Sequence, residues 1–197
     1  MNVLFYSVKW GQGKTTHAVW YTKYADLQLC TNDSQNATVD IYGSLFPEKP
    51  IIVLKPGEGI NDIPDNWIVY DFWGFLDKRV VEVAQKVNLC VVPVYYQSIA
   101  DITPAIKTID ALKEYNPNII ILINNSDPKE TRYLETLFDE LTPNIPKFII
   151  NKSKYISKLP NEWKTISELF DENGLNKYML RNLLPQIKKM YSYIDKS

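Results

Sequence analysis

Residues 9–16 constrain the fold of this chain more than any other segment. They read Lys-Trp-Gly-Gln-Gly-Lys-Thr-Thr, follow an apolar run at 3–6 and continue into a stretch that can form a helix. Glycines ahead of Lys14 let backbone N–H groups close around phosphate oxygens, while Lys14 would reach the β- and γ-phosphates and the Thr15 hydroxyl would complete a Mg²⁺ shell. The N-terminus of the helix would face the same anion. The segment therefore predicts a phosphate-binding loop between a strand and a helix.

The spacing within this loop departs from the ordinary one. A standard phosphate loop has glycine where this chain has Val8, and a second lysine, Lys9, stands five residues before Lys14. This departure narrows the function more than the motif itself does. The residues that we expect at the nucleotide are Lys9, Gly11, Gln12, Gly13, Lys14, Thr15, Thr16 and Asn125.

Short apolar, β-branched runs alternate along the chain with helical stretches. We expect strands at 2–8, 27–31, 50–54, 67–70, 88–94, 118–124 and 147–150. We expect helices at 15–25, 77–87, 98–115, 129–141 and 176–194, with shorter helical pieces near 153–158 and 164–170. Continuous apolar runs suit strands that are covered on both faces, and their alternation with helices indicates a doubly wound, mostly parallel sheet. The sequence predicts a single α/β domain over residues 1–197, similar to the phosphate-loop NTPases.

The charge of the chain is unevenly distributed. The net charge of −1 over 197 residues argues against nucleic-acid binding by the whole surface. Residues 1–146 hold 12 Lys and Arg against 18 Asp and Glu, whereas residues 147–197 hold 10 against 5. The basic C-terminal quarter could contact a phosphate backbone, or its lysines could merely solvate a helical surface.

Nothing in the sequence indicates export or membrane insertion. The first apolar run is short and leads directly into the phosphate loop, and no apolar stretch approaches the roughly 20 residues that span a bilayer. Cys30 and Cys90 lie in apolar runs without CxxC spacing, which favours buried, reduced thiols. We therefore expect a cytoplasmic protein.

Two carboxylates follow predicted strands. Asp71 closes the apolar run 67–70, where a phosphate-loop protein holds its Mg²⁺ ion, although a strand-terminal Asp can also cap a turn. Asp33 follows the strand at 27–31 and could orient or deprotonate the water that attacks the γ-phosphate. The alternative for Asp33 is a residue of an Asx-turn in a polar loop.

These segments together resemble one family. Residues 9–16 resemble the deviant Walker A box, KGGxGK[ST]T, of the ParA/MinD group of ATPases. Residues 33–38 look like the DxDPQGNAT segment of that group, shortened by one residue, and 68–71 match its Walker B strand. The run at 91–94 matches an apolar-Pro strand of ParA proteins, and the later elements align in order. The resemblance spans nearly the whole chain and favours a compact, plasmid-type ParA protein.

The resemblance implies an ATPase that forms a homodimer around two molecules of Mg²⁺-ATP. Lys9 would be the signature lysine that reaches the phosphates of the partner subunit. The implied catalytic residues are Lys9, Lys14 and Asp33, and the implied metal-binding residues are Thr15 and Asp71. ATP-bound ParA dimers bind DNA nonspecifically, and a centromere-binding, ParB-like partner releases them by stimulating hydrolysis during plasmid or chromosome partition. We therefore expect nucleoid association and no stable membrane association.

Three departures from the family pattern lie around the nucleotide. Thr31 stands where the family has the first Asp of DxD, and Trp10 replaces the first glycine of the loop. The ring of Trp10 is expected to pack at the dimer interface or on the switch region. Residues 72–74, Phe-Trp-Gly, replace small residues after the Walker B Asp. These changes are compatible with slow turnover or altered control by a partner.

The predicted helix 176–194 has an apolar face and a basic one. On an ideal helix Lys177, Arg181 and Lys188 share one side, with Lys189 adjacent, and in ParA proteins this region contributes to DNA binding. These four residues are the candidates for phosphate contacts, although the stripe taken alone is typical of core packing. Pro185 interrupts the pattern and is expected to kink the helix.

Two other functions remain open at this stage. The first is a nucleotide switch that dimerises on ATP with little hydrolysis, which Trp10 and Thr31 favour. The second is a MinD-like positioning ATPase on membranes. That function needs a terminal amphipathic helix free of the core, whereas the apolar face of 176–194 is expected to pack and the tail at 195–197 is nearly neutral.

Overall fold

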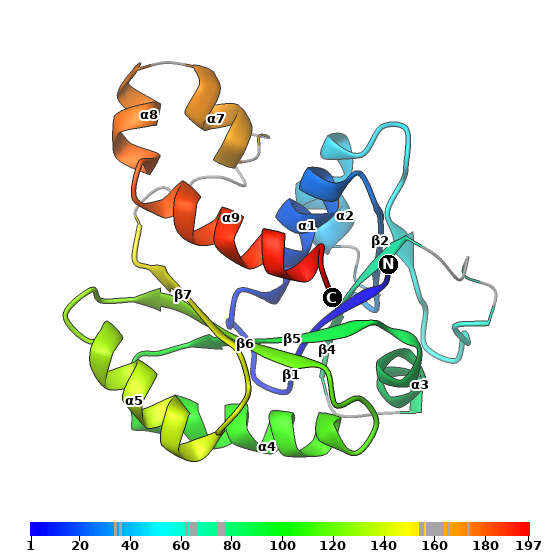
Figure 1. Ribbon diagram of the computed structural model, residues 1–197. Coiled ribbons are helices and arrows are strands. Elements are labelled where there is room, and N and C mark those ends of the chain that lie inside the picture. The colour runs from blue at the N-terminus through cyan, green and yellow to red at the C-terminus, as the bar shows by residue number, and fades with distance from the viewer. Residues whose placement is uncertain are drawn as a thin grey trace.

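The computed structural model describes residues 1–33, 35, 37–61, 63, 67–74, 78–153, 156, 164, 166–172 and 174–197. In this part of the chain a central sheet carries helices on both faces (Figure 1). All seven strands of the sheet run parallel, in the order β3-β2-β4-β1-β5-β6-β7. The predicted fold, a doubly wound α/β sheet in one domain, is confirmed.

The elements follow the predicted order closely. The strands are β1 (Val3–Ser7), β2 (Gln28–Thr31), β3 (Ile52–Val53), β4 (Ile68–Trp73), β5 (Leu89–Tyr95), β6 (Ile119–Ser126) and β7 (Lys147–Asn151). The helices are α1 (Lys14–Ala25), α2 (Ala37–Tyr42), α3 (Lys78–Lys86), α4 (Ile102–Lys113), α5 (Thr131–Leu141), α7 (Ile166–Glu172), α8 (Gly174–Leu180) and α9 (Leu183–Ile194). Two short 3₁₀ turns are η1 (Gly43–Leu45) and η2 (Ile99–Asp101). The helical piece expected near 153–158 lies outside the described residues apart from Ser153 and Ile156.

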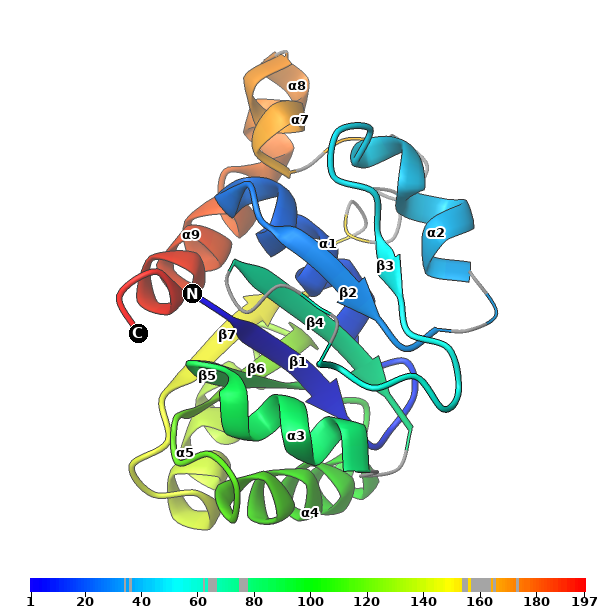
Figure 2. The ribbon, with the colours of Figure 1, turned by 90° about the vertical axis from the view of Figure 1, so that its right-hand side faces the viewer.

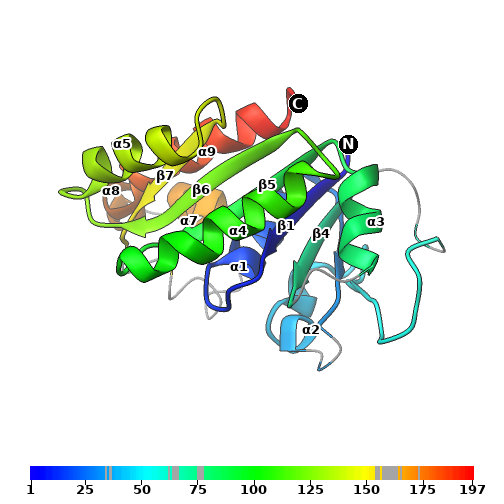
Figure 3. The ribbon, with the colours of Figure 1, turned by 90° about the horizontal axis from the view of Figure 1, so that it is seen from below.

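The central strands supply both apolar layers, because successive side chains point to opposite faces of the sheet. In β1, Val3 and Phe5 pack in a core with α1, α7, α8 and α9, whereas Leu4 and Tyr6 pack in the other core with α3, α4 and α5. Figure 3 shows α3, α4 and α5 lying across one face, and Figure 2 shows α1 and α9 on the other. Burial on both faces explains the uninterrupted apolar runs of the sequence.

Pro93 lies inside β5, a strand with neighbours on both sides. The N–H of Cys90 donates to Asn118 beside β6, so the amide position of Pro93 faces β1. The pairing of β1 with β5 ends at Val91, so the missing N–H of Pro93 falls beyond the last paired residue. The proline thus costs the sheet no hydrogen bond at this position.

The single C-terminal helix predicted at 176–194 is wrong: the chain forms α8 and α9 with a break at Arg181 and Asn182. Pro185 explains the break, because its ring clashes with the carbonyl of Arg181 four residues earlier and it has no N–H to donate there. Placed in the first turn of α9, the proline is tolerated. The pair α7–α8 therefore stands beyond α9, away from the sheet (Figures 1 and 2).

The strand order fixes where a ligand can bind. The chain moves from β1 to β2 through α1 on one face, and from β4 to β5 through α3 on the other face. Connections that diverge in this way leave a crevice at the carboxyl ends of the strands. The loop after β1 and the ends of β2 and β4 border that crevice.

Candidate functional site

The phosphate loop joins β1 to α1 and depends on two glycines. Gly11 and Gly13 have φ angles of 71° and 84°, in the left-handed region that glycine adopts without a steric cost. A Cβ atom on Gly13 would also lie 2.2 Å from Nδ2 of Asn124. Trp10 is not among the residues with positive φ, so the loop does not need the glycine that the family has there.

A pocket of about 400 Å³ lies above this loop. Its lining comes from the loop, the start of α1, the segment after β2 and the end of β4. The lining residues are Trp10, Gly11, Gln12, Gly13, Lys14, Thr15, Thr16, Asp33, Gln35, Ala37, Thr38 and Trp73. The structure thus brings Asp33 together with the predicted loop residues, and it adds Trp73, which sequence reasoning treated only as a departure.

The Lys14 side chain folds back onto the phosphate loop. Its Nζ donates a hydrogen bond of 2.9 Å to the carbonyl of Lys9, and the side chain is largely buried. Burial lowers the pKa of Lys14, and the nearby Asp71 carboxylate opposes part of this shift. The ammonium group therefore sits at the pocket with one carbonyl partner and an acidic neighbour beneath it.

Asp71 is a buried carboxylate without a hydrogen-bond partner among the described residues. It lies within β4, paired in register with Phe5 and Thr31, so the expectation that it follows the strand is wrong; β4 extends past it to Trp73. Burial raises its pKa to about 6, while the Thr15 hydroxyl and the Lys14 charge act in the opposite direction and Asp33 adds to the rise. A buried, unpartnered carboxylate beside a hydroxyl suits a divalent cation, so Thr15 and Asp71 fit the predicted Mg²⁺ site.

Asp33 caps the helix that follows it. Its Oδ2 accepts hydrogen bonds from the N–H of Thr38 at 2.9 Å and from the Thr38 hydroxyl at 3.1 Å, and its Oδ1 accepts one from the N–H of Gln35 at 3.2 Å. Helix α2 was not expected from the sequence, and the cap explains why it forms despite its three β-branched residues. Ser34 and Asn36, which belong to the same motif, lie outside the described residues.

Thr31 links the two carboxylates through the backbone. Its hydroxyl donates to the carbonyl of Asp71 at 3.0 Å and accepts from the N–H of Asp33 at 3.2 Å. The threonine is fully buried. At the first position of the DxD pattern this chain therefore has a neutral hydroxyl that bonds the backbone of Asp71 and Asp33. The absence of a carboxylate there leaves less negative charge around the expected metal position.

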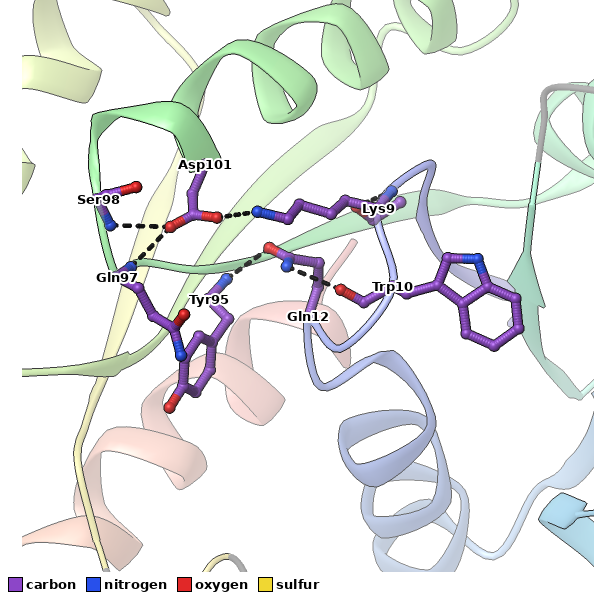
Figure 4. Close-up of polar contacts among 8 residues, drawn as sticks. Lys9, Trp10, Gln12, Tyr95, Gln97, Ser98 and Asp101 are labelled. Carbon is purple, nitrogen blue, oxygen red and sulfur yellow. Dashed lines mark hydrogen bonds and ion pairs between the residues drawn. The ribbon is translucent and has the colours of Figure 1, made fainter.

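The side chains of Lys9 and Gln12 both bind to groups of the protein itself (Figure 4). Lys9 forms an ion pair with Asp101 at the end of η2. Gln12 accepts a hydrogen bond of 2.8 Å from the N–H of Tyr95 and donates one of 3.1 Å to the carbonyl of Trp10. At Gln12 the backbone N–H is therefore the group that we expect to meet a phosphate. These contacts fasten the loop to the end of β5.

Asn125 lies near the end of β6 with a φ of 57°, a conformation that asparagine tolerates better than most residues. Its neighbour Asn124, which the sequence analysis did not single out, is the one that contacts the loop: Nδ2 lies 3.5 Å from the carbonyl of Gln12. Beneath it, His17 is fully buried and burial lowers its pKa to about 4, against a smaller opposite effect of Asn124. A neutral His17 is thus part of the floor of the loop.

Sequence reasoning missed several residues that shape the site. One of them carried a detectable signal: Ser98 and Asp101 have the spacing of a capping box, and they form one at the start of η2. Asn32 carried none. Its side chain accepts from the N–H of Trp73 at 3.0 Å and donates to the carbonyl of Trp73 at 2.9 Å, which fixes the end of β4 beside the pocket.

The comparison with known proteins rests on structure. The sequence matches no protein family profile and no curated protein. Among solved structures, apo McdA from Cyanothece superposes with a TM-score of 0.71 at 13% identity, over 93% of this chain and 99% of that one. The MinD cell division protein of Aquifex aeolicus gives 0.62 at 16% identity, over 98% and 97%. A ParA family ATPase from Chlorobium tepidum gives 0.58 at 14% identity, over 92% and 98%.

The chain has the fold of the ParA/MinD ATPases. The fold implied by the sequence resemblance is therefore confirmed. In this ParA/MinD fold, the described residues include no helix that is long and apolar enough to cross a bilayer.

The four basic candidates occupy separate places in this ParA/MinD fold. Lys177 lies on α8, Arg181 in the break before α9, and Lys188 and Lys189 on α9, so the single stripe expected from the sequence is wrong. All four are exposed. Lys177 lies 5.6 Å from the ring centroid of Phe170, and Arg181 lies 4.0 Å from that of Tyr178. The break at Arg181 and Asn182, which Pro185 explains, divides them.

Proposed function

We propose that this chain is a Mg²⁺-ATP-dependent ATPase that dimerises on ATP, binds DNA nonspecifically and drives partition of plasmid or chromosomal DNA. A centromere-binding, ParB-like protein would be its partner, and its place would be the nucleoid in the cytoplasm. The observation that carries the proposal is the pocket above the phosphate loop, which is lined by Lys14, Thr15 and Asp33. The unpartnered buried carboxylate of Asp71 lies close to Lys14 and Thr15.

The site residues divide the work of phosphoryl transfer. Loop N–H groups and Lys14 bind the phosphates, and Thr15 and Asp71 hold the metal ion. When bound, Mg²⁺ would neutralise charge that develops on the phosphates. Asp33 lies on the pocket wall, where its carboxylate can orient the attacking water or accept its proton. McdA, one of the similar structures, is known as an ATP complex, which supports ATP as the nucleotide.

Lys9 connects hydrolysis with assembly. Its side chain is 40% exposed, so the ammonium can turn outward to the triphosphate of a second subunit. A cation that arrives only in the dimer stabilises the transition state only there, so hydrolysis and dimer state are linked. Asp33 would have to break its hydrogen bonds with Thr38 before it could bind the attacking water. This step would keep turnover slow.

The exposed basic residues of α8 and α9 are the proposed DNA contacts. Contacts with phosphates make affinity depend on salt, with a slope of about −0.9 per neutralised phosphate in log K against log[salt]. Replacing both Lys188 and Lys189 by alanine should therefore weaken binding to any sequence and flatten the salt dependence by about 2 units. The matched control replaces Lys107 and Lys113 of α4, which lie on the opposite face of the sheet.

One experiment tests the proposed function as a whole. Light scattering of the purified protein with ATP, ADP and no nucleotide gives the oligomeric state, and fluorescence anisotropy then measures binding to random-sequence duplex DNA in each state. The expected result is a dimer with DNA affinity only with Mg²⁺-ATP. A protein that stays monomeric with ATP, or whose DNA affinity ignores nucleotide, contradicts the proposal.

A second candidate function is a nucleotide switch with little hydrolysis. The rings of Trp10 and Trp73 are in tilted contact at the pocket, and the neutral Thr31 replaces a family carboxylate. Both features are compatible with binding without turnover. Phosphate release in the presence of DNA and the cognate partner separates the two functions, because the switch would show no ATP turnover above background.

The structure gives little support to a MinD-like membrane function. The apolar residues of α9, among them Leu184, Ile187 and Met190, are buried against the sheet and α1, so this helix is not free to enter a lipid surface. Sedimentation with anionic liposomes that depends on ATP would favour that function over the proposed one.

A further inference from the structure

Lys9 has a partner within its own chain. Its Nζ pairs with Oδ1 of Asp101, 92 residues further along (Figure 4). The Asp101 side chain is 5% exposed, whereas that of Lys9 is 40% exposed. In the proposed function Lys9 contacts the ATP of the other subunit. In this structure it instead pairs with a buried carboxylate of its own subunit.

The two oxygens of Asp101 divide their partners. Oδ2 accepts hydrogen bonds from the N–H of Gln97 at 2.8 Å and from that of Ser98 at 2.9 Å, and Oδ1 pairs with Lys9. The capping box with Ser98 holds the carboxylate in place. Lys9 can therefore leave while Asp101 keeps both charge-assisted bonds to the backbone, so the pair can open without unfolding the turn.

We infer that Asp101 is a positioning residue that holds Lys9 on its own subunit until a second ATP-loaded subunit competes for it. This inference deepens the proposed function and rests on it. A triphosphate carries several negative charges, so it attracts the ammonium more strongly than one carboxylate does. The ion pair raises the ATP concentration at which the dimer forms. Before assembly it also keeps Lys9 away from the phosphates of the ATP bound to its own subunit.

The contact reaches beyond the two side chains. The N–H of Val8 lies 3.4 Å from the Thr108 hydroxyl on α4, and Gln12 accepts from Tyr95 at the end of β5. Residues on both sides of the loop are therefore fastened to the segment that begins at the end of β5 and continues into α4. Release of Lys9 removes the charged member of this set and leaves the neutral ones.

A capping role alone would explain the burial of Asp101 but predicts a different result. If the carboxylate served only η2, its loss would lower stability and leave the ATP dependence of dimerisation unchanged. Asp101→Asn separates the two roles, because the amide oxygen can still accept from Gln97 and Ser98 while the charge that binds Lys9 is gone. Ser98→Ala is the converse variant, which weakens the cap and leaves the ion pair.

The first measurement is light scattering of the full chain against ATP concentration. We expect Asp101→Asn to lower the ATP concentration at half dimerisation by roughly three- to tenfold, the range for one partly buried ion pair. Ser98→Ala should leave it unchanged. Asp110→Asn is the matched control, since it removes an exposed carboxylate from α4 that lies 4.0 Å from Lys113.

The second measurement does not depend on ATP. Acetylation of lysine amines by an N-hydroxysuccinimide ester, quantified by peptide mass spectrometry, should modify Lys9 several times faster in Asp101→Asn than in wild type, with exposed Lys107 as the internal reference. Thermal unfolding confirms that the variant is folded, and Asp101→Ser replaces it if it is not.

The outcomes are distinct. Equal Lys9 acetylation, or an equal ATP half-point in a folded variant, overturns the role of Asp101 while wild-type dimerisation still supports the proposed function. Failure of every variant and of the wild type to dimerise with ATP overturns the proposed function, and the role of Asp101 with it.

Discussion

Trp10 and Trp73 pack ring against ring, with centroids 4.2 Å apart and planes inclined by 51°. One ring belongs to the phosphate loop and the other to the end of β4, and both line the pocket. Within this chain the Trp10 ring thus contacts the residue two positions after Asp71, and its expected packing at a dimer interface stays a prediction. Asn32 holds the backbone of Trp73 through two hydrogen bonds, whereas the side chain of Trp10 is largely exposed.

The tryptophan pair should report nucleotide binding. Trp10 is 66% exposed, so closure of the loop on a phosphate or contact with a second subunit will change its surroundings and its fluorescence. Trp10→Phe should remove most of the ATP-dependent change in emission. Trp67→Phe is the control, because Trp67 is 63% exposed and directly precedes β4, at the end of that strand opposite Trp73. An unchanged signal in Trp10→Phe would place the response elsewhere.

Lys14→Ala should abolish nucleotide-dependent dimerisation. A hydrogen bond to a charged group contributes about 1.5–3 kcal/mol, so ATP affinity should fall about ten- to hundredfold. Calorimetric titration with ATP measures the affinity, and light scattering measures the dimer. Lys86→Ala, at the exposed end of α3, should behave as wild type. Retained dimerisation in Lys14→Ala would show that the loop binds phosphate without it.

Lys9→Ala should spare ATP binding and block hydrolysis. The expected loss in kcat is about 10²–10³, the range for removing one preorganised group from a developing charge. ATP affinity measured by calorimetry should stay within about threefold, since Lys14 and the loop backbone remain. If the variant hydrolyses ATP normally, Lys9 has no role in hydrolysis and serves only its ion pair with Asp101. Lys107→Ala on α4 is the charge control.

Two variants separate the catalytic and capping roles of Asp33. Asp33→Ala should trap the ATP dimer and also destabilise the fold by about 1 kcal/mol through loss of the α2 cap. Asp33→Asn keeps a capping oxygen for Thr38 and removes the basic carboxylate, so it should trap the dimer with nearly wild-type stability. Phosphate release and thermal unfolding of both variants are the measurements. Full turnover in either one would refute the catalytic assignment.

Asp71 should make the stability of the nucleotide-free protein depend on pH. Its pKa is raised from 3.8 to about 6, so between these values the native state holds a proton that the unfolded state has released. The stability contributed by this proton is lost as pH rises toward 6. Asp71→Asn should therefore stabilise the protein by about 1–3 kcal/mol at pH 7.5, with a gain that fades toward pH 4.

The same carboxylate sets the pH dependence of metal binding. Below about pH 6 its protonated form cannot hold Mg²⁺, so the effect of Mg²⁺ on ATP affinity should weaken by up to about tenfold per pH unit. Calorimetric titrations at pH 5.5 and 7.5 measure it. Asp71→Asn shows how much of the change belongs to the nucleotide itself. Equal Mg²⁺ dependence at the two pH values in wild type would contradict the metal role of Asp71.

The sequence was sufficient for the sheet and for the loop because both depend on local pattern. Runs covered on both faces predicted all seven strands, and the glycines and lysine of residues 9–16 predicted the phosphate-binding loop between a strand and a helix. The carboxylates were placed less well: Asp71 lies inside β4, since pairing with Phe5 and Thr31 continues the strand past the apolar run.

What the sequence did not predict depends on contacts between distant segments. Lys9 and Asp101, or Gly13 and Asn124, become neighbours only through the strand order, which no local pattern reveals. The break between α8 and α9 was within reach of local rules, because Pro185 excludes a helical hydrogen bond to Arg181. Helix α2 could not be predicted by such rules. Its capping residue, Asp33, lies in a polar segment whose composition is typical of turns.

The cross-links of the phosphate loop bear on how the protein is made. Gln12 is tied to Tyr95 and Asn124, 83 and 112 residues away, so a nascent chain that has only its first ninety residues contains the loop sequence without its supports. Parallel strands of such separation pair late in folding. ATP should then bind the finished chain and not its precursors, and by binding it should shift the balance away from unfolding and degradation. The nucleotide would thereby distinguish folded molecules from chains still being synthesised.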